Sequence, residues 1–369
     1  MTSPAEQGGT LWHVEDSGAG HRVTLKKVAR EVGVSMATVS KVVNGRAGVS
    51  ASTRARVQHV IGELGYVSIG ERQRSTHERG ETSIELLVDA KDIANPYIST
   101  FLQGVMEAAG QFEVGVTMRN LTGVERRDPV PWAQKLARSG RSGVIELTSG
   151  FSAARARALR AVALPMVLVD PIDVPRTSIP SIGATNWQGA YEATRHLLDL
   201  GHRNIAYIGG PDGAACDIAR AHGWAAAMAE AGVPVDATAV LRHSYTFDHG
   251  FTAARTLLGA PDRPTAIFAG SDVSAMGVLE AARQAGLTVP DDLSVVGFDD
   301  TAIARLATPP LTTVHQPIAD IGRTAIITLL RLARGESLVT KRSELATELV
   351  VRATTAPPSR GIDNPPPQA

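Results

Sequence analysis

The sequence predicts an α/β protein with two parallel-sheet lobes, preceded by a small all-α headpiece. Three observations lead to this fold class. Residues 21–80 hold 11 Lys and Arg against 4 Asp and Glu, a net charge of +7, although the whole chain of 369 residues has a net charge of zero. The same segment contains three short amphipathic helical patterns. Beyond it, apolar strands alternate with amphipathic helices for roughly 270 residues, which is long for one sheet and favours two lobes.

Composition divides the chain into five segments. Residues 1–21 have no helical or strand period and predict a disordered extension, and residues 357–369 predict a Pro-rich disordered tail. The helical headpiece is expected over 22–67 and the two-lobed part over 82–356. Between them, residues 68–81 lose nearly all hydrophobic content, which predicts a hinge or linker.

Three helices are expected in the headpiece, each with one apolar face. The faces consist of Leu25, Val28, Ala29 and Val32, then Val39, Val42 and Val43, then Val57, Val60, Ile61 and Leu64. Helix N-caps are expected at Thr24, Ser35 and Ser50, and left-handed C-terminal residues at Gly45 and Gly65. Together the three faces can close one small core.

The second helix has the polarity of a recognition helix that enters the major groove of DNA. Lys41 can donate to guanine, and Met36 or Ala37 can contact a thymine methyl group. Hydroxyls, cations and helix N-termini around it suit phosphate. A bundle used only for packing is the alternative, which this outward polarity disfavours. The predicted DNA contacts are Thr24, Lys26, Lys27, Ser35, Met36, Ala37, Thr38, Ser40, Lys41, Arg46, Ser50, Thr53 and Arg54.

The larger part has the rhythm of right-handed βαβ units. Strands are expected within 83–89, 142–149, 165–170, 204–210, 265–270 and 293–299, and helices within 101–112, 192–201, 221–232 and 274–286. In such sheets a ligand lies beyond the carboxyl ends of the strands. Four acids stand there: Asp89, Asp170, Asp272 and Asp299. Carboxylates at these places suit sugar hydroxyls, although an acid after a strand is more often a helix N-cap, above all Asp272.

Two runs of the headpiece, "VTLKKVAREVGVSMATVSKVVNG" and "VSASTRARVQHVIGELGYV", resemble the lactose-repressor (LacI/GalR) family of bacterial transcription regulators. The resemblance continues through "NPYISTFLQGV", "GHRNIAYIGGP", "RAHGW", "SDVSAMGVLEAARQAGLTVPDDLSVVGFDD" and "PPLTTVHQP". It covers nearly everything from Val23 to about Pro357. It implies a periplasmic-binding-protein-like effector domain, with a ligand cleft between its two lobes.

The resemblance also implies roles for residues of that cleft. Arg220 corresponds to an arginine that clamps the ligand from the second lobe, Asp299 and Asp170 to acids that bind it, and Tyr245 to an aromatic that stacks on it. Tyr97 is expected at the rim of the first lobe. Arg220 and Asp299 are expected at opposite edges of the cleft, in different lobes. Cys216 falls in a loop that usually offers the ligand a hydroxyl or amide, and a thiol there is a poor donor.

The hinge departs from the family pattern. The family usually carries Asn-x-x-Ala-x-x-Leu there, and its leucine wedges between base steps in the minor groove. Here Ser75 stands at the leucine position, and Arg72 and Arg74 replace small residues. Either the arginines bind a narrow minor groove electrostatically or the segment is a solvated linker.

These features predict a cytoplasmic, homodimeric, sequence-specific DNA-binding regulator that a small sugar releases from a pseudo-palindromic operator. The alternatives are a corepressor- or activator-type regulator of the same family, a regulator that binds a purine instead of a sugar, or a sugar-binding transport or chemotaxis protein. No Walker loop, G-x-S-x-G elbow or H-E-x-x-H motif is present, so no enzyme, cofactor or metal site is expected. One cysteine excludes an internal disulfide, and no apolar run resembles a signal peptide or a membrane span.

Overall fold

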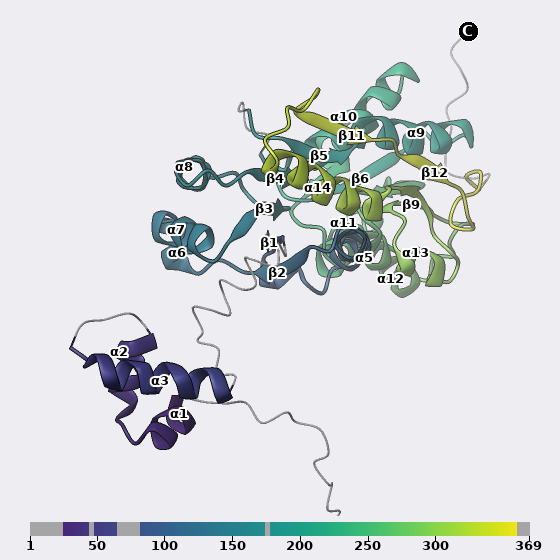
Figure 1. Ribbon diagram of the computed structural model, residues 1–369. Coiled ribbons are helices and arrows are strands. Elements are labelled where there is room, and N and C mark those ends of the chain that lie inside the picture. Colours follow the sequence, from purple (N-terminus) through teal and green to yellow (C-terminus); the bar gives the residue numbers. More distant parts are fainter. Residues whose placement is uncertain (1–24, 44–47, 65–81, 174–177, 360–369) are drawn as a thin grey trace, which may run out of the picture. The chain divides into compact units, whose positions relative to one another are not determined.

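The computed structural model describes residues 25–43, 48–64, 82–173 and 178–359 (Figure 1). The chain divides into two compact units, Met1–Gly80 and Glu81–Ala369. The finer boundaries expected from the sequence remain predictions, and the hinge residues Arg72, Arg74 and Ser75 lie outside the described residues.

The first unit contains three helices around a valine core. They are α1 (Leu25–Val32), α2 (Met36–Val43) and α3 (Ala51–Leu64). Val28, Val39 and Val57, one from each helix, are fully buried against one another. The predicted apolar faces therefore do close one core, although the side chains of Leu25 and Leu64 lie outside the described residues. A hydrogen bond also links α3 to α1, because the Arg56 guanidinium donates to the Val32 carbonyl oxygen at 2.6 Å.

Two of the predicted helix caps are present. The Ser35 hydroxyl accepts from the Thr38 amide at 3.1 Å at the start of α2, and Ser50 accepts from the Thr53 amide at 3.3 Å at the start of α3. Each bond satisfies a backbone donor that a helix start leaves without a partner. The caps predicted at Thr24, Gly45 and Gly65 lie outside the described residues.

The first lobe of the second unit is a six-stranded sheet with strand order β11-β5-β4-β3-β1-β2, all parallel. Its elements are β1 (Ser83–Leu87), a 3-10 turn (Ala90–Asp92), α5 (Pro96–Gln111), β2 (Gly115–Arg119), α6 (Gly123–Arg127), α7 (Val130–Arg138), β3 (Arg141–Leu147), α8 (Ala153–Ala161), β4 (Met166–Val169), β5 (Ser181–Ala184), α14 (Ile318–Ala333) and β11 (Arg342–Leu345). One core packs α5 and α14 on the sheet, and a second packs α7 and α8 on the other face.

The second lobe repeats this plan with strand order β12-β10-β9-β8-β6-β7, in which only β12 runs antiparallel. Its elements are α9 (Asn186–Asp199), β6 (Ile205–Gly209), α10 (Ala215–Glu230), a 3-10 turn (Ala237–Ala239), β7 (Val240–Arg242), α11 (Phe247–Leu258), β8 (Ala266–Ala269), α12 (Asp272–Gln284), β9 (Ser294–Asp299), α13 (Ala302–Leu306), β10 (Thr312–His315) and β12 (Glu348–Val350). The two-lobed α/β class expected from the sequence is confirmed.

The chain crosses between the lobes three times: after β5, after β10 and after β11. Two of these crossings are hydrogen-bonded to each other. The Thr185 amide donates to the Leu345 carbonyl oxygen, and the Thr347 amide donates to the Thr185 hydroxyl, both at 2.9 Å. These two crossings thus run side by side in the same direction, while the crossing after β10 runs back. Short connecting segments of this kind allow two lobes to close on a ligand as hinged bodies.

Helix α14 returns from the second lobe to cover the first, where it packs beside α5 (Figure 1). The crossing is closest at Gly104, where a Cβ atom would stand 1.8 Å from the carbonyl oxygen of Ala319. Only a residue without a side chain allows this approach. Gly322 on α14 faces the backbone of α5 in the same way.

A buried ion pair joins β3 to α8. The Arg155 guanidinium donates to the Glu146 carboxylate and, at 2.8 Å, to the Gly150 carbonyl oxygen. Their side chains are 7% and 2% exposed. Because both side chains are almost fully buried, the opposite charge of each compensates most of the other's loss of hydration.

Candidate functional site

The exposed face of α2 carries the residues expected to contact bases. Met36, Ala37 and Lys41 are exposed, while Val39 and Val42 on the opposite side are buried. Met36 leaves 55% of its surface accessible, so its side chain is available for contact with a partner. The buried and exposed faces predicted for this helix are therefore confirmed.

The remaining predicted DNA contacts lie at helix starts or on half-buried positions. The start and first turns of α2 carry Ser35, Thr38 and Ser40, and those of α3 carry Ser50, Thr53 and Arg54. Lys27 lies half-buried on α1. Thr24, Arg46 and the side chain of Lys26 lie outside the described residues. Contact of these residues with DNA stays a prediction.

A second candidate site lies between the two lobes of the larger unit. From the first lobe, the Tyr97 hydroxyl at the start of α5 donates to the Asp170 carboxylate, which directly follows β4. The Asn95 side chain caps the N-terminus of α5 by accepting a hydrogen bond from the Tyr97 backbone amide at 3.0 Å, which fixes the backbone position of Tyr97. The neighbouring strand leaves room for Asp170 at Gly183, where a Cβ atom would meet the Asp170 Oδ1 at 2.6 Å.

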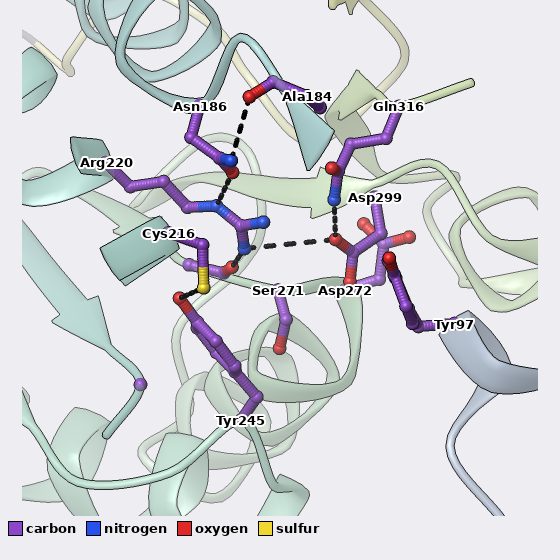
Figure 2. A network of polar contacts seen from close by, with 12 residues as sticks. Tyr97, Ala184, Asn186, Cys216, Arg220, Tyr245, Ser271, Asp272, Asp299 and Gln316 are labelled. Carbon is purple, nitrogen blue, oxygen red and sulfur yellow. Dashed lines mark hydrogen bonds and ion pairs between the residues drawn. The ribbon is translucent and has the colours of Figure 1, made fainter. Parts of the chain in front are cut away.

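From the second lobe, Arg220 on α10 reaches into the same cleft (Figure 2). Its Nε donates to the Asn186 side-chain oxygen at 2.8 Å, and its Nη1 donates to the Gly270 carbonyl oxygen at 2.5 Å. The guanidinium stacks on the Phe298 ring, 3.8 Å from the centroid. With these contacts Arg220 is held in one orientation before any ligand arrives.

Asp299 completes this side of the cleft. Its Oδ1 lies 3.9 Å from the Arg220 Nη1 and accepts from the Gln316 amide at 2.6 Å, as Figure 2 shows. Burial raises the pKa of Asp299, an effect that Arg220 and the Gln316 hydrogen bond partly offset and the Asp170 charge reinforces. Burial likewise raises the pKa of Asp170, while the Tyr97 hydroxyl and Arg220 oppose that rise.

Backbone geometry separates Asp170 and Asp299 from the other strand-end acids. Their φ angles are 41° and 113°, values that L-residues rarely adopt. Each such conformation costs about 1–3 kcal/mol and persists where the surroundings impose it, often at ligand sites. Asp89, by contrast, has an ordinary φ of −74° and caps a 3-10 turn. Of the four acids predicted at strand ends, these are the two that share the cleft with Arg220, while Asp300 and Glu113 have positive φ angles elsewhere.

The expectation that Arg220 and Asp299 belong to different lobes is wrong. Arg220 lies on α10 and Asp299 ends β9, and both elements belong to the second lobe. The two residues pair with each other inside that lobe, and the first lobe's acid is Asp170. The sequence misleads here because 79 positions separate the two residues along the chain, whereas β9 and β6, the strand that precedes α10, are both neighbours of β8.

Tyr245 and Cys216 line the same region. The Cys216 sulfur lies 3.9 Å from the Tyr245 hydroxyl, which in turn donates to the Asp217 carboxylate at 2.9 Å. Asp217 is fully buried and also accepts from the Tyr207 hydroxyl and the Arg242 guanidinium. The Tyr245 ring is therefore held by its hydroxyl. Burial raises the pKa of the Cys216 thiol, so the sulfur is uncharged at neutral pH.

Asp272 and Asp89 make their hydrogen bonds to residues other than Arg220, Asp299 and Asp170. Asp272 is fully buried and accepts from the Thr301 amide, the Thr301 hydroxyl and the Thr313 hydroxyl at 2.6–2.9 Å. These bonds fasten the start of α12 to the neighbouring loop and strand. Asp89 accepts from the Lys91 amide at 3.3 Å and lies 3.5 Å from Arg126. Ligand binding by either acid stays a prediction that these contacts do not support.

Sequence inspection missed three residues of the site: Asn186, Gln316 and Asp217. Asn186 follows β5 and Gln316 follows β10, so the rule that singled out acids after strands applies equally to these two amides. Both amides orient a charged residue of the cleft through hydrogen bonds at 2.8 and 2.6 Å. Asp217 lies within α10, where no strand-end rule applies.

The assembled cleft presents one fixed cation, two partly desolvated carboxylates and two phenol rings. Such a set of donors, acceptors and apolar ring faces suits a small polyhydroxylated molecule. The described residues hold no cluster of three or more His, Cys, Asp or Glu that could bind a metal ion. In the part of the chain that the structure describes, no helix is both long and apolar enough to cross a bilayer.

Comparison with known families matches the chain in two places. The model for bacterial regulatory proteins of the lacI family matches residues 24–68, which include α1, α2 and α3. The model for a periplasmic binding protein-like domain matches residues 194–355. The two matches correspond to the headpiece and to most of the second lobe with its returning segments.

Individual relatives match over nearly the whole chain. The HTH-type transcriptional regulator DegA of Bacillus subtilis is 35% identical over 91% of this chain and 99% of its own length. A solved complex of the transcriptional regulator CelR with cellobiose is 32% identical, with a TM-score of 0.67 over 90% of this chain and 100% of that one. The lac repressor dimer bound to operator and the anti-inducer ONPF is 30% identical, with a TM-score of 0.66 over 90% and 99%.

Proposed function

The chain belongs to the lacI family of bacterial regulatory proteins, and from that premise we propose that a small sugar controls its attachment to an operator. It is a DNA-binding transcriptional regulator, as its relatives are. The headpiece binds the operator through α2, and the interlobe cleft binds the effector. The relatives act in transcription rather than in catalysis, and this chain has the same role.

The observation that carries this proposal is the cleft that holds Arg220, Asp299 and Asp170. The three side chains come from both lobes, so a ligand that contacts all of them favours one arrangement of the lobes over another. A regulator needs this property, because a ligand shifts an equilibrium only by its difference in affinity between two states. The bound cellobiose of the related regulator supports a sugar as this ligand.

The assembly that we propose is a homodimer on a pseudo-palindromic operator in the cytoplasm. One headpiece of three short helices makes few contacts, and two headpieces related by a two-fold axis match inverted half-sites. The dimeric lac repressor on its operator supports this arrangement. The effector acts as an inducer, which lowers the affinity for the operator.

The test is a mobility-shift assay with full-length protein, DNA selected by that protein from a random pool, and a panel of sugars. At least one sugar should release the DNA, with a change of about 5- to 150-fold in operator affinity. A sugar that tightens the complex would make the effector a corepressor and overturn the inducer assignment. Binding of no sugar, with intact DNA binding, would overturn the sugar proposal itself.

The headpiece assignment predicts two different effects of removing cations. Arg54→Ala should weaken binding to every DNA sequence and flatten the slope of log K against log salt by about 0.9, the value for one lost phosphate contact. Lys41→Ala should instead change which operator sequence is preferred, because Lys41 lies on the exposed face of α2. Competition binding on matched operator variants distinguishes them. Equal loss on all sequences for both variants would remove Lys41 from base recognition.

A further inference from the structure

A cavity of about 360 Å³ opens beside the cleft, where the chain crosses between the lobes. The first lobe contributes β5, β11 and the loop after β4, and the second lobe contributes the first turns of α9 and α10. This volume is within the range of about 300–1,000 Å³ that small-molecule sites occupy. Most of its lining residues have no role in the effector cleft described above.

The cavity shares its inner wall with the effector cleft. Asp170 lines the cavity and also accepts the Tyr97 hydroxyl bond. Asn186 lines it and also accepts from Arg220, and Cys216 lines it while its sulfur lies 3.9 Å from the Tyr245 hydroxyl. The same three side chains thus line the cavity and contact residues of the effector cleft, so the two spaces adjoin each other.

The outer wall offers an aromatic face and hydroxyl partners. Trp187 lines the cavity and remains 42% exposed, and its ring stacks on Tyr191 with centroids 5.2 Å apart. This stacking holds the indole in place. Gln188, Ser343 and Glu344 supply an amide, a hydroxyl and a carboxylate at the rim. A rigid aromatic with a few polar groups around it suits one sugar ring.

The charges of the wall disfavour an anionic ligand. Asp170 and Glu344 both line the cavity, and Glu344 raises the pKa of Asp170. Among the described residues of the lining, Arg342 is the one cation, and its guanidinium lies 2.6 Å from the Glu344 carboxylate. A phosphorylated or carboxylated sugar would therefore meet like charge, whereas neutral hydroxyls find acceptors.

We propose that this cavity is a second subsite of the effector cleft, and that the effector is a neutral sugar of at least two units. One unit binds at Arg220 and Asp299, and the next passes Asp170 and Cys216 to lie against Trp187. The inference rests on the sugar effector proposed above and specifies its size and charge. Because both lobes line the cavity, the second unit adds contacts to each of them.

The test is calorimetric titration of the full-length protein with glucose, galactose and mannose, with disaccharides built from them, and with their 6-phosphates. At least one disaccharide should bind about tenfold or more tightly than its monosaccharide, since it gains hydrogen bonds and buried ring surface. The 6-phosphates should bind more weakly than the neutral sugars. Ala219→Leu, which fills the cavity from α10, should remove the disaccharide's advantage and leave monosaccharide affinity unchanged.

Two controls keep the result specific. Ala229→Leu places the same side chain on an exposed position of the same helix and should change neither affinity. Iodide quenching of Trp187, measured as the difference from a Trp187→Phe protein, should fall with the disaccharide but not with the monosaccharide. The difference removes the signals of Trp12, Trp132 and Trp224.

The outcomes separate this proposal from the one on which it rests. Monosaccharide binding without any gain for a disaccharide, or a gain that survives Ala219→Leu, would overturn the second subsite alone. Tighter binding of a 6-phosphate would overturn its neutral character. Binding of no sugar at all would overturn the sugar effector and the subsite with it.

Discussion

An Arg220→Ala protein is expected to bind its operator normally and to lose its response to the effector. The substitution removes the one cation of the cleft, and charge-assisted hydrogen bonds of this kind contribute about 1.5–3 kcal/mol, which corresponds to an affinity loss of roughly 10- to 150-fold. It also leaves Asp299 buried beside Asp170 without its cation. The pKa of Asp299 then rises further, so the carboxylate is lost as an acceptor.

Titration calorimetry measures the loss of effector affinity, and a mobility-shift assay measures the operator affinity. Arg334→Ala changes an exposed arginine at the end of α14 and should leave both quantities unchanged. Release of the operator from Arg220→Ala at the effector concentration that suffices for the unchanged chain would remove Arg220 from the site.

The pairing of Arg220 with Asp299 makes a further result expected. Because the two charges lie 3.9 Å apart within one lobe, the losses from Arg220→Ala and Asp299→Asn should not add in the double variant. Two residues that held the ligand independently from opposite lobes would give additive losses. Additivity would therefore favour the arrangement that the sequence suggested over the one that the structure shows.

The largest loss of stability is expected from Arg155→Met. This change leaves the Glu146 carboxylate, 2% exposed, without the guanidinium that compensates its burial. Removal of one member of a buried pair lowers the free energy of unfolding by about 3–5 kcal/mol. Urea denaturation followed by tryptophan fluorescence, to which Trp132 in the same core as α8 contributes, measures the change.

Matched variants separate the ion pair from the loss of an arginine. Arg157→Met lies on the exposed side of the same helix and should change stability by less than about 0.5 kcal/mol. The double variant Arg155→Met/Glu146→Leu should recover most of the loss, because no unpaired charge remains. Equal stability of Arg155→Met and Arg157→Met would show that the pair contributes nothing.

The headpiece and the sheet strands could be predicted because their patterns are local. Valines at helical spacing define the core of Val28, Val39 and Val57, and Ser35 and Ser50 mark helix starts by their chemistry alone. Strand-end acids were predicted by the same local rule. It found Asp170 and Asp299 but could not separate them from Asp272, whose three donors come from residues 29 and 41 positions away.

What could not be predicted depends on chain topology. The alternation of strand and helix patterns continues unchanged after β10, so the sequence does not indicate that α14 returns to the first lobe. Its only local trace is a pair of glycines, Gly104 and Gly322, which become meaningful once the two helices are known to cross. The placement of Arg220 and Asp299 in one lobe has the same origin, since sheet order rather than sequence distance makes them neighbours.

The three crossings also determine when each lobe can complete its fold during synthesis on the ribosome. The first lobe lacks α14 and β11 until residue 345 has been made, long after β5 ends at Ala184. At about 5–20 residues per second, the intervening stretch of roughly 160 residues takes about 10–30 s to synthesise. During that interval the edge of β5 that later pairs with β11 has no partner, and the surface of α5 around Gly104 that α14 later covers is exposed. A chain that stops early, at Pro317, therefore leaves both lobes unfinished, with an open strand edge that invites aggregation.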